Sequence, residues 1–248
     1  VSFYHEKGIP VEAVKLYLLT IANSNFEEWL DNNPNTDTRE FKLDFKKMSA
    51  SGSLFDVSKL FNISKNYLSR QTATTIYNNL LNWALEFDQE FYDILKNNQE
   101  FAIKVFNIER ETPKPRKDYL SYSDIKNHVW YMFDEYFHDL TYDFQKVNTK
   151  EEITNILTTY LNNYLDLSDK DIWFNKIKEM CDTLGYASNM KDYKKNPENY
   201  KGNVADVSTV LRVALTTKTN TPDLYEIMNL LGENKIKERF TKCLNNLD

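Results

Sequence analysis

The chain is poor in the residues that make tight turns. Its 248 residues include five glycines and six prolines. Folds rich in strands need frequent turns, and those turns depend on glycine, proline and asparagine–glycine pairs. The scarcity favours long helices joined by few turns, so we predict an all-α fold. It also excludes nucleotide binding by the two common glycine-rich loops, because neither G-x-G-x-x-G nor G-x-x-x-x-G-K-[ST] occurs.

Cysteine and long apolar runs are scarce as well. Cys181 and Cys243 are too few and too isolated for a disulfide framework or a zinc site, so we expect small core residues in a reducing, cytoplasmic protein. No stretch approaches the roughly 18 apolar residues of a membrane-spanning helix. The first residues lack an initiator methionine and the features of a signal peptide, so we interpret the start as a cut through a longer protein.

The balance of charge is acidic. The formal net charge is −6, and the 41% hydrophobic and 27% charged residues are typical of a globular protein. The chain as a whole is therefore not a basic nucleic-acid clamp. Net charge does not exclude RNA as a partner, because local fields steer charged ligands.

Apolar residues recur at helical spacing along much of the chain, and capping residues predict where several helices begin. Residues 188–201 are polar, and we expect a loop there. For three helices we predict only the start, at Pro10, at Ser123 and at Thr149, the last with a Glu152 capping box. Four more helices have both limits predicted: 75–92, Ser168 to Gly185, 207–216, and Thr221-Pro222 to Gly232. A last helix carries Ile236 and Phe240 on one face.

No arrangement of residues predicts chemistry in this chain. His5, His128 and His138 are scattered, and Asp124 with His128 on one helix face is only two ligands, so we expect ordinary histidines and no metal site. No G-x-S-x-G or H-E-x-x-H string occurs. We therefore predict no catalytic residue and no cofactor for this chain.

The aromatic run 130–137 has two interpretations. It could be a platform on which RNA bases stack. Helical spacing divides the run between two faces, however, so we expect most of its large side chains to lie in the core. These are Trp130, Tyr131, Met132, Phe133, Tyr136 and Phe137.

A basic loop with two prolines lies between residues 110 and 117. It contains Arg110, Lys114, Arg116 and Lys117, and residues before proline are held in extended conformations. Arginine hydrogen-bonds and stacks on unpaired bases, which is how many proteins read single-stranded RNA. The loop is therefore either an RNA-reading element, with Arg110 and Lys117 as further contacts, or a solvated basic linker.

Three stretches, taken in order, carry a resemblance to a known family. Residues 3–14 read F-Y-H-E-K-G-I-P-V-E-A-V and residues 51–60 read S-G-S-L-F-D-V-S-K-L. Near the end stand L-R-V-A-L-T at 211–216, T-P at 221–222 and L-Y-E-I-M-N-L-L-G at 224–232. The chain resembles the C-terminal, tRNA-binding part of bacterial glutamyl-tRNA synthetases, whose patterns include S-G-x-x-F-D-x-x-K-L, L-R-x-A-L-T, T-P and L-x-E-I-M-x-L-L-G.

The resemblance implies residues that contact the anticodon. The family's R-P-R string matches Lys114-Pro115-Arg116 and points to Arg116, and its last bundle points to Arg212, Thr221 and Pro222. A further family arginine falls near Lys178, where lysine keeps the charge but lacks the bidentate fork. Simpler explanations stay open, because Thr221-Pro222 suits helix capping and Arg212 could snorkel from a half-buried helix.

The resemblance also implies an organisation and partners. We expect a helical stem-contact region at 1–88 and two anticodon-binding helical bundles at 89–146 and 147–248, in a monomer that binds glutamate-accepting tRNA and neither DNA nor membrane. The catalytic domain, with its ATP and magnesium, would belong to the parent protein. The H-x-G-H segment is missing, and Ala50 replaces the second lysine of a K-M-S-K-S-like string at 46–51. The alternative is a helical protein–protein interaction or regulatory module without tRNA binding.

Overall fold

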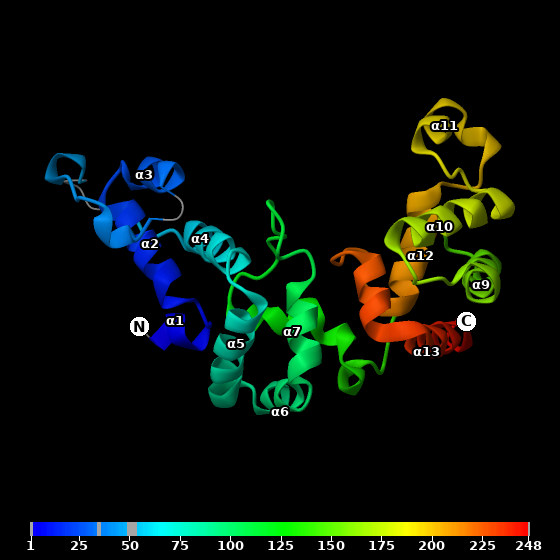
Figure 1. Ribbon diagram of the computed structural model, residues 1–248, viewed down its shortest axis with the longest axis horizontal. Helices are drawn as coiled ribbons and strands as arrows, with labels where there is room; N and C mark the ends of the chain where they lie inside the picture. Colours follow the sequence, from blue (N-terminus) through cyan, green and yellow to red (C-terminus); the bar gives the residue numbers. More distant parts are fainter. Residues whose placement is uncertain (1, 34–35, 49–53, 248) are drawn as a thin grey trace. The chain divides into compact units, whose positions relative to one another are not determined.

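The fold is all-α, as predicted. The computed structural model describes residues 2–33, 36–48 and 54–247, and within these ranges it contains thirteen α-helices and no strand (Figure 1). An isolated β-bridge joins Ala187 and Asn203. In the part of the chain described, no helix is both long and apolar enough to cross a bilayer. Ala50 and the residues 51–53 of the second resembling stretch lie outside the described ranges.

The chain divides into two compact units, Val1–His128 and Val129–Asp248. The division at 1–88, 89–146 and 147–248 stays a prediction. The helices of the first unit are α1 (Ser2–Glu6), α2 (Val11–Ala22), α3 (Phe26–Asn32), α4 (Val57–Ser69), α5 (Ala73–Phe87), α6 (Gln89–Asn97), α7 (Gln99–Asn107) and α8 (Tyr122–Val129), with short 3-10 turns η1 (Thr38–Glu40) and η2 (Phe45–Lys47).

Two groups of helices build the first unit. Helix α2 starts directly after Pro10, as predicted, and packs against α4 around the fully buried side chains of Ala13, Tyr17 and Leu60. The Tyr17 hydroxyl accepts a hydrogen bond of 2.6 Å from the backbone N–H of Asp56, which connects α2 to the start of α4. Helix α5 packs against α6 and α7.

The single long helix predicted over 75–92 is wrong, because Asp88 divides it. Its backbone leaves the helical region at φ −149°, while its N–H still bonds to the carbonyl of Ala84 at the end of α5. Its carboxylate accepts a hydrogen bond from the N–H of Phe91 and caps α6. One residue thus ends one helix and begins the next.

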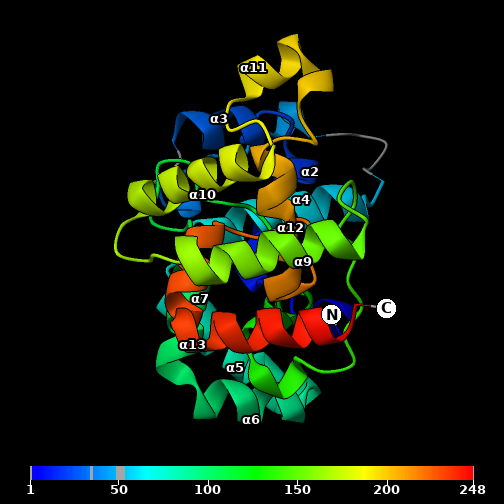
Figure 2. The same ribbon diagram turned by 90° about the vertical axis from the view of Figure 1, so that its right-hand side faces the viewer.

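The second unit follows with η3 (Trp130–Met132), η4 (Asp134–Tyr136), α9 (Lys150–Thr159), the π-helical turn η5 (Tyr160–Tyr164), α10 (Lys170–Leu184), α11 (Met190–Lys195), η6 (Pro197–Asn199), α12 (Val204–Thr216) and α13 (Leu224–Asn245). Helix α12 packs against α9, α10 and α13, as Figures 1 and 2 show. Its buried face makes it the centre of this unit.

Helix starts in the second unit agree only in part with the capping predictions. Thr149 caps α9 as predicted, and Gly185 ends α10 at φ 83°. The cap of α10 is Asp169 instead of Ser168, and the cap of α13 is Asp223 instead of Thr221. In both places two residues at most two positions apart offer a side-chain oxygen, and the sequence does not decide which of them will reach the first backbone amides of the helix.

The loop predicted at 188–201 instead contains α11 and η6. The helix end predicted at Gly232 is confirmed, because Gly232 breaks α13 into two helical parts with φ 79° and ψ 162°, a backbone region that is essentially restricted to glycine. A Cβ built at Gly232 would meet nothing within 4 Å, so the kink depends on the backbone alone.

The aromatic run 130–137 lies mainly in the core, as predicted. Tyr131, Met132, Phe133 and Phe137 are buried. The same region surrounds a buried arginine that the sequence did not single out. The guanidinium of Arg239, whose residue is only 1% exposed, lies 3.8 Å from the centre of the Phe137 ring.

Arg239 is held by groups from three segments. It donates hydrogen bonds to the carbonyl oxygens of Tyr131 (2.6 Å) and Leu215 (3.0 Å), and it forms an ion pair with Asp134 (3.2 Å). Burial lowers the pKa of Arg239 and the pairing with Asp134 opposes that shift. Cys181 and Cys243 are also buried, as expected for small core residues.

We predict that Arg239→Ala lowers the free energy of unfolding by about 3 kcal/mol, because two buried carbonyls lose their donor and a cavity replaces the side chain. Urea denaturation followed by circular dichroism measures the change. Lys237→Ala on the same helix is the control: its side chain is 53% exposed and forms one surface ion pair among the described residues, with Glu233, so its effect should stay within about 0.5 kcal/mol. Equal effects of the two substitutions would contradict a structural role for Arg239.

Candidate nucleic-acid interface

The loop at 109–118, here called the proline loop, follows α7 and is closed on itself. Glu109 has a positive φ of 54°, which turns the chain directly after the helix. The N–H of Arg116 donates a 3.1 Å hydrogen bond to the carbonyl of Glu109, so the two ends of the loop are joined. Pro113 is exposed between them. The loop is therefore exposed as predicted, but it folds back on itself where the prolines had predicted an extended segment.

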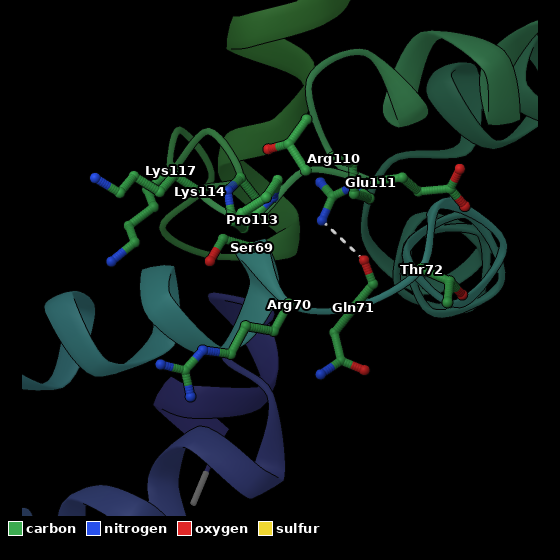
Figure 3. Close-up of a pocket in the computed structure, with 11 residues that line it drawn as sticks. Ser69, Arg70, Gln71, Thr72, Arg110, Glu111, Pro113, Lys114 and Lys117 are labelled. Carbon is green, nitrogen blue, oxygen red and sulfur yellow. Dashed lines mark hydrogen bonds between the residues drawn. The ribbon is translucent and has the colours of Figure 1, made fainter. Parts of the chain in front are cut away.

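Arg110 anchors the proline loop to the body of the first unit. Its guanidinium donates hydrogen bonds to the carbonyls of Phe106 (2.8 Å), Leu68 (2.7 Å) and Gln71 (3.0 Å), and the contact with Gln71 is drawn in Figure 3. It also lies 5.7 Å from the centre of the Tyr119 ring. Burial lowers the pKa of Arg110 and raises that of Tyr119. The donors of Arg110 thus point into the protein.

Arg116 and Lys117 are placed differently from Arg110. Nε of Arg116 lies 2.5 Å from Oδ2 of Asp118, with side-chain exposures of 29% and 24%. Lys117 and Lys114 are exposed, and Figure 3 shows their amino groups extending away from the loop. Arg116 is therefore oriented by a carboxylate two residues away, while the neighbouring ammonium groups face solvent.

Three of the residues predicted in the second unit form one cluster. Arg212 on α12 donates hydrogen bonds through Nη1 to Oγ1 of Thr221, to the carbonyl of Thr221 (3.5 Å) and to the carbonyl of Pro222 (3.0 Å). Thr221 is 6% exposed, whereas Arg212 and Pro222 are half-buried. Arg212 therefore fixes the turn between α12 and α13 and still reaches the surface.

Lys178 lies on α10, one of the helices packed against α12. Its ammonium group stands 4.7 Å from the centre of the Phe174 ring, and Phe174 is 38% exposed. A cation over an exposed aromatic ring is a stable surface feature.

His128 takes part in a local pair with Asp124, as its helix spacing suggested. The Nε2 of His128 and the Oδ2 of Asp124 are 3.0 Å apart. Within the ranges that the structure covers, no group of three or more histidine, cysteine, aspartate or glutamate side chains is arranged to hold a metal ion.

Sequence reasoning missed the partners that orient the predicted residues. Asp118 pairs with Arg116, and the i, i+2 spacing of opposite charges was a usable signal. Leu68 and Gln71 bind Arg110 through their backbone carbonyls. Backbone partners some forty residues away leave no signal in a single sequence.

A comparison with protein families identifies the family of this chain. The family model described as "Anticodon binding domain" matches residues 111–244, more than half of the chain. The chain belongs to the anticodon-binding domain family. The matched residues include Arg116, Lys117, Lys178, Arg212 and Thr221-Pro222, whereas Arg110 directly precedes them.

Relatives extend the similarity over nearly the whole chain. The glutamate–tRNA ligase of Clostridium perfringens (strain SM101) is 44% identical over 247 residues, covering 98% of this chain and 45% of that protein. The glutamate–tRNA ligase of Sorangium cellulosum is 34% identical, covering 98% of this chain and 43% of that protein. The resemblance found in the sequence is confirmed. This anticodon-binding family member spans less than half the length of the curated relatives it matches.

Solved structures show the same fold. A glutamate tRNA ligase from Elizabethkingia meningosepticum, solved in complex with its amino acid, matches with a TM-score of 0.65 at 17% identity. The match covers 99% of this chain and 43% of that one. The all-α arrangement of this anticodon-binding family member therefore recurs in a protein with few identical residues.

We predict that Arg110→Gln loosens the proline loop without unfolding the first unit, because a glutamine cannot reach three carbonyls at once. Hydrogen exchange of the Thr112 and Arg116 amides should become faster by roughly tenfold, which corresponds to about 1.4 kcal/mol of lost local stability. Lys114→Gln in the same loop is the matched control and should leave this exchange unchanged. Unaltered protection in Arg110→Gln would contradict the anchoring role.

Proposed function

We propose that this chain is the tRNA-binding part of a glutamate–tRNA ligase and contacts the anticodon through Arg116 and the Arg212 cluster. The main support for this proposal is the match of residues 111–244 to an anticodon binding domain. Relatives named glutamate–tRNA ligase also align with nearly the whole chain. The geometry adds support, because both arginines are held in fixed orientations at the protein surface.

The contacts divide into two kinds. Arginine presents a planar fork that pairs with a base edge or stacks on it, so Arg116 and Arg212 are assigned to base recognition. Lys117 and Lys178 are point charges suited to phosphates. Thr221 and Pro222 shape the turn that Arg212 braces. Arg110 acts as a positioning residue for the proline loop, since its Nε and Nη1 donate to backbone carbonyls.

The chemistry of the ligase belongs to another part of the parent protein under this proposal. That part would bind ATP and magnesium and attach glutamate, while this chain orients the tRNA as a monomer in the cytoplasm. The proposal makes binding, and not turnover, the activity to measure on the 248-residue chain.

We expect Arg116→Ala and Arg212→Ala each to weaken binding of a tRNA with the glutamate anticodon by about 1–3 kcal/mol if each arginine contacts a base. Arg116→Lys should lose most of the same discrimination, because lysine keeps the charge but not the fork. Filter binding at low salt, with the same tRNA carrying a changed anticodon as the comparison, measures the preference.

Lys104→Gln provides the control, since Lys104 is exposed on α7 and lies outside the proline loop. The melting temperature of Arg212→Ala separates lost binding from a loosened turn. Anticodon preference that survives in both arginine variants would refute the residue assignment. Indifference of the unmodified chain to any tRNA would instead favour a protein–protein interaction module.

A further inference from the structure

The proline loop forms one side of a pocket that extends beyond the residues matched to the anticodon-binding family. The pocket has a volume of about 660 Å³, within the range of about 300–1,000 Å³ that is typical of ligand sites. Its other side is residues 69–72, the junction between α4 and α5. Figure 3 shows these two segments around the pocket. We call it the basic pocket.

The lining of the basic pocket is positive although the chain is acidic. Four cationic side chains line it, and Glu111 is the only carboxylate among its lining residues. The cations are Arg70, Arg110, Lys114 and Lys117. Such a reversal of sign against a net charge of −6 concentrates anions locally.

The cations of the basic pocket are available to a ligand, apart from Arg110. Arg70, Lys114 and Lys117 are exposed, and none forms an ion pair with another described residue. Arg110 instead holds the pocket in shape, because its bonds to the carbonyls of Leu68 and Gln71 fasten the proline loop to the α4–α5 junction. The pocket is therefore built before any ligand arrives.

We propose that the basic pocket binds the sugar–phosphate backbone of the RNA strand whose bases meet Arg116, with Arg70 and Lys114 as phosphate contacts. This inference rests on the proposed function and adds a second, sequence-independent contact to it. Arg70 lies 41 residues before the first residue of the family match and belongs to the α4–α5 junction.

The continuity of the chain favours RNA over other anions. Lys117 lines the basic pocket, while its neighbour Arg116 does not, so a strand with one base at Arg116 carries its adjacent phosphates to the pocket. Phosphates follow one another along a strand, and the cations are likewise distributed over two segments instead of converging on one point. Lysine and arginine at such positions set the register of the strand without reading its sequence.

The test compares two double variants of the 248-residue chain. Arg70→Gln/Lys114→Gln removes one cation from each side of the basic pocket and leaves Lys117 and Arg116 in place. Lys96→Gln/Lys104→Gln removes two exposed charges from α6 and α7 and is the matched control. Circular dichroism melting of both variants checks that the fold is unchanged.

The dissociation constant is measured at several salt concentrations for a tRNA with the glutamate anticodon and for the same tRNA with a changed anticodon. The pocket variant should show a salt slope shallower by roughly 1.5, since each lost phosphate contact removes about 0.7–0.9. Its affinity should fall by the same factor for both tRNAs, because phosphates carry no sequence information. The control should keep the slope of the unmodified chain. Arg70→Lys/Lys114→Arg should keep it as well, because charge is retained.

The outcomes separate this inference from the proposed function. An unchanged slope in the pocket variant, with anticodon preference intact, overturns the phosphate site and leaves the proposed function standing. A lost preference with an unchanged slope also overturns it, because the pocket would then read bases. Absence of anticodon preference in the unmodified chain overturns the proposed function itself.

Discussion

The position of the proline loop depends on the guanidinium group of Arg110, which donates hydrogen bonds to three backbone carbonyls. The last carbonyls of a helix have no partner within the helix, and they form the negative end of its dipole. Arg110 supplies donors to the carbonyls of Phe106 in α7 and Leu68 in α4, so it ends two helices at once. Without Arg110, the loop that follows α7 would lose the hydrogen bonds that join it to Leu68 and Gln71 at the α4–α5 junction.

Arginine side chains also donate hydrogen bonds to backbone carbonyls near helix ends in the second unit. Arg239 donates to the carbonyl of Leu215 near the end of α12, and Arg212 donates to the carbonyls that follow that helix. Glycine often performs this task by turning left-handed after a helix. Gly185 does so after α10, and Thr217 adopts the same left-handed conformation after α12 at φ 61°. The arginine contacts therefore supplement left-handed turns at helix ends and do not replace them.

The sequence predicts the fold class and most helices, because apolar spacing depends on local geometry. It fails where two residues compete for one task. Asp169 and Asp223 cap helices that Ser168 and Thr221 were expected to cap, and Asp88 divides a segment whose apolar pattern is continuous. The candidate residues were found by motif, but their surroundings were not. Whether the guanidinium of Arg110 faces solvent or carbonyls depends on Leu68 and Gln71, which only the folded chain brings near.

The kink at Gly232 shows what kind of constraint a single backbone angle can impose. Space is available beside the α-carbon, since an added methyl group would meet nothing, yet φ 79° with ψ 162° is the mirror image of an extended conformation that L-residues adopt freely. The restriction at Gly232 therefore concerns handedness and not size. A D-alanine introduced by chemical synthesis would satisfy it, and would also reduce the conformational freedom that glycine brings to the unfolded chain.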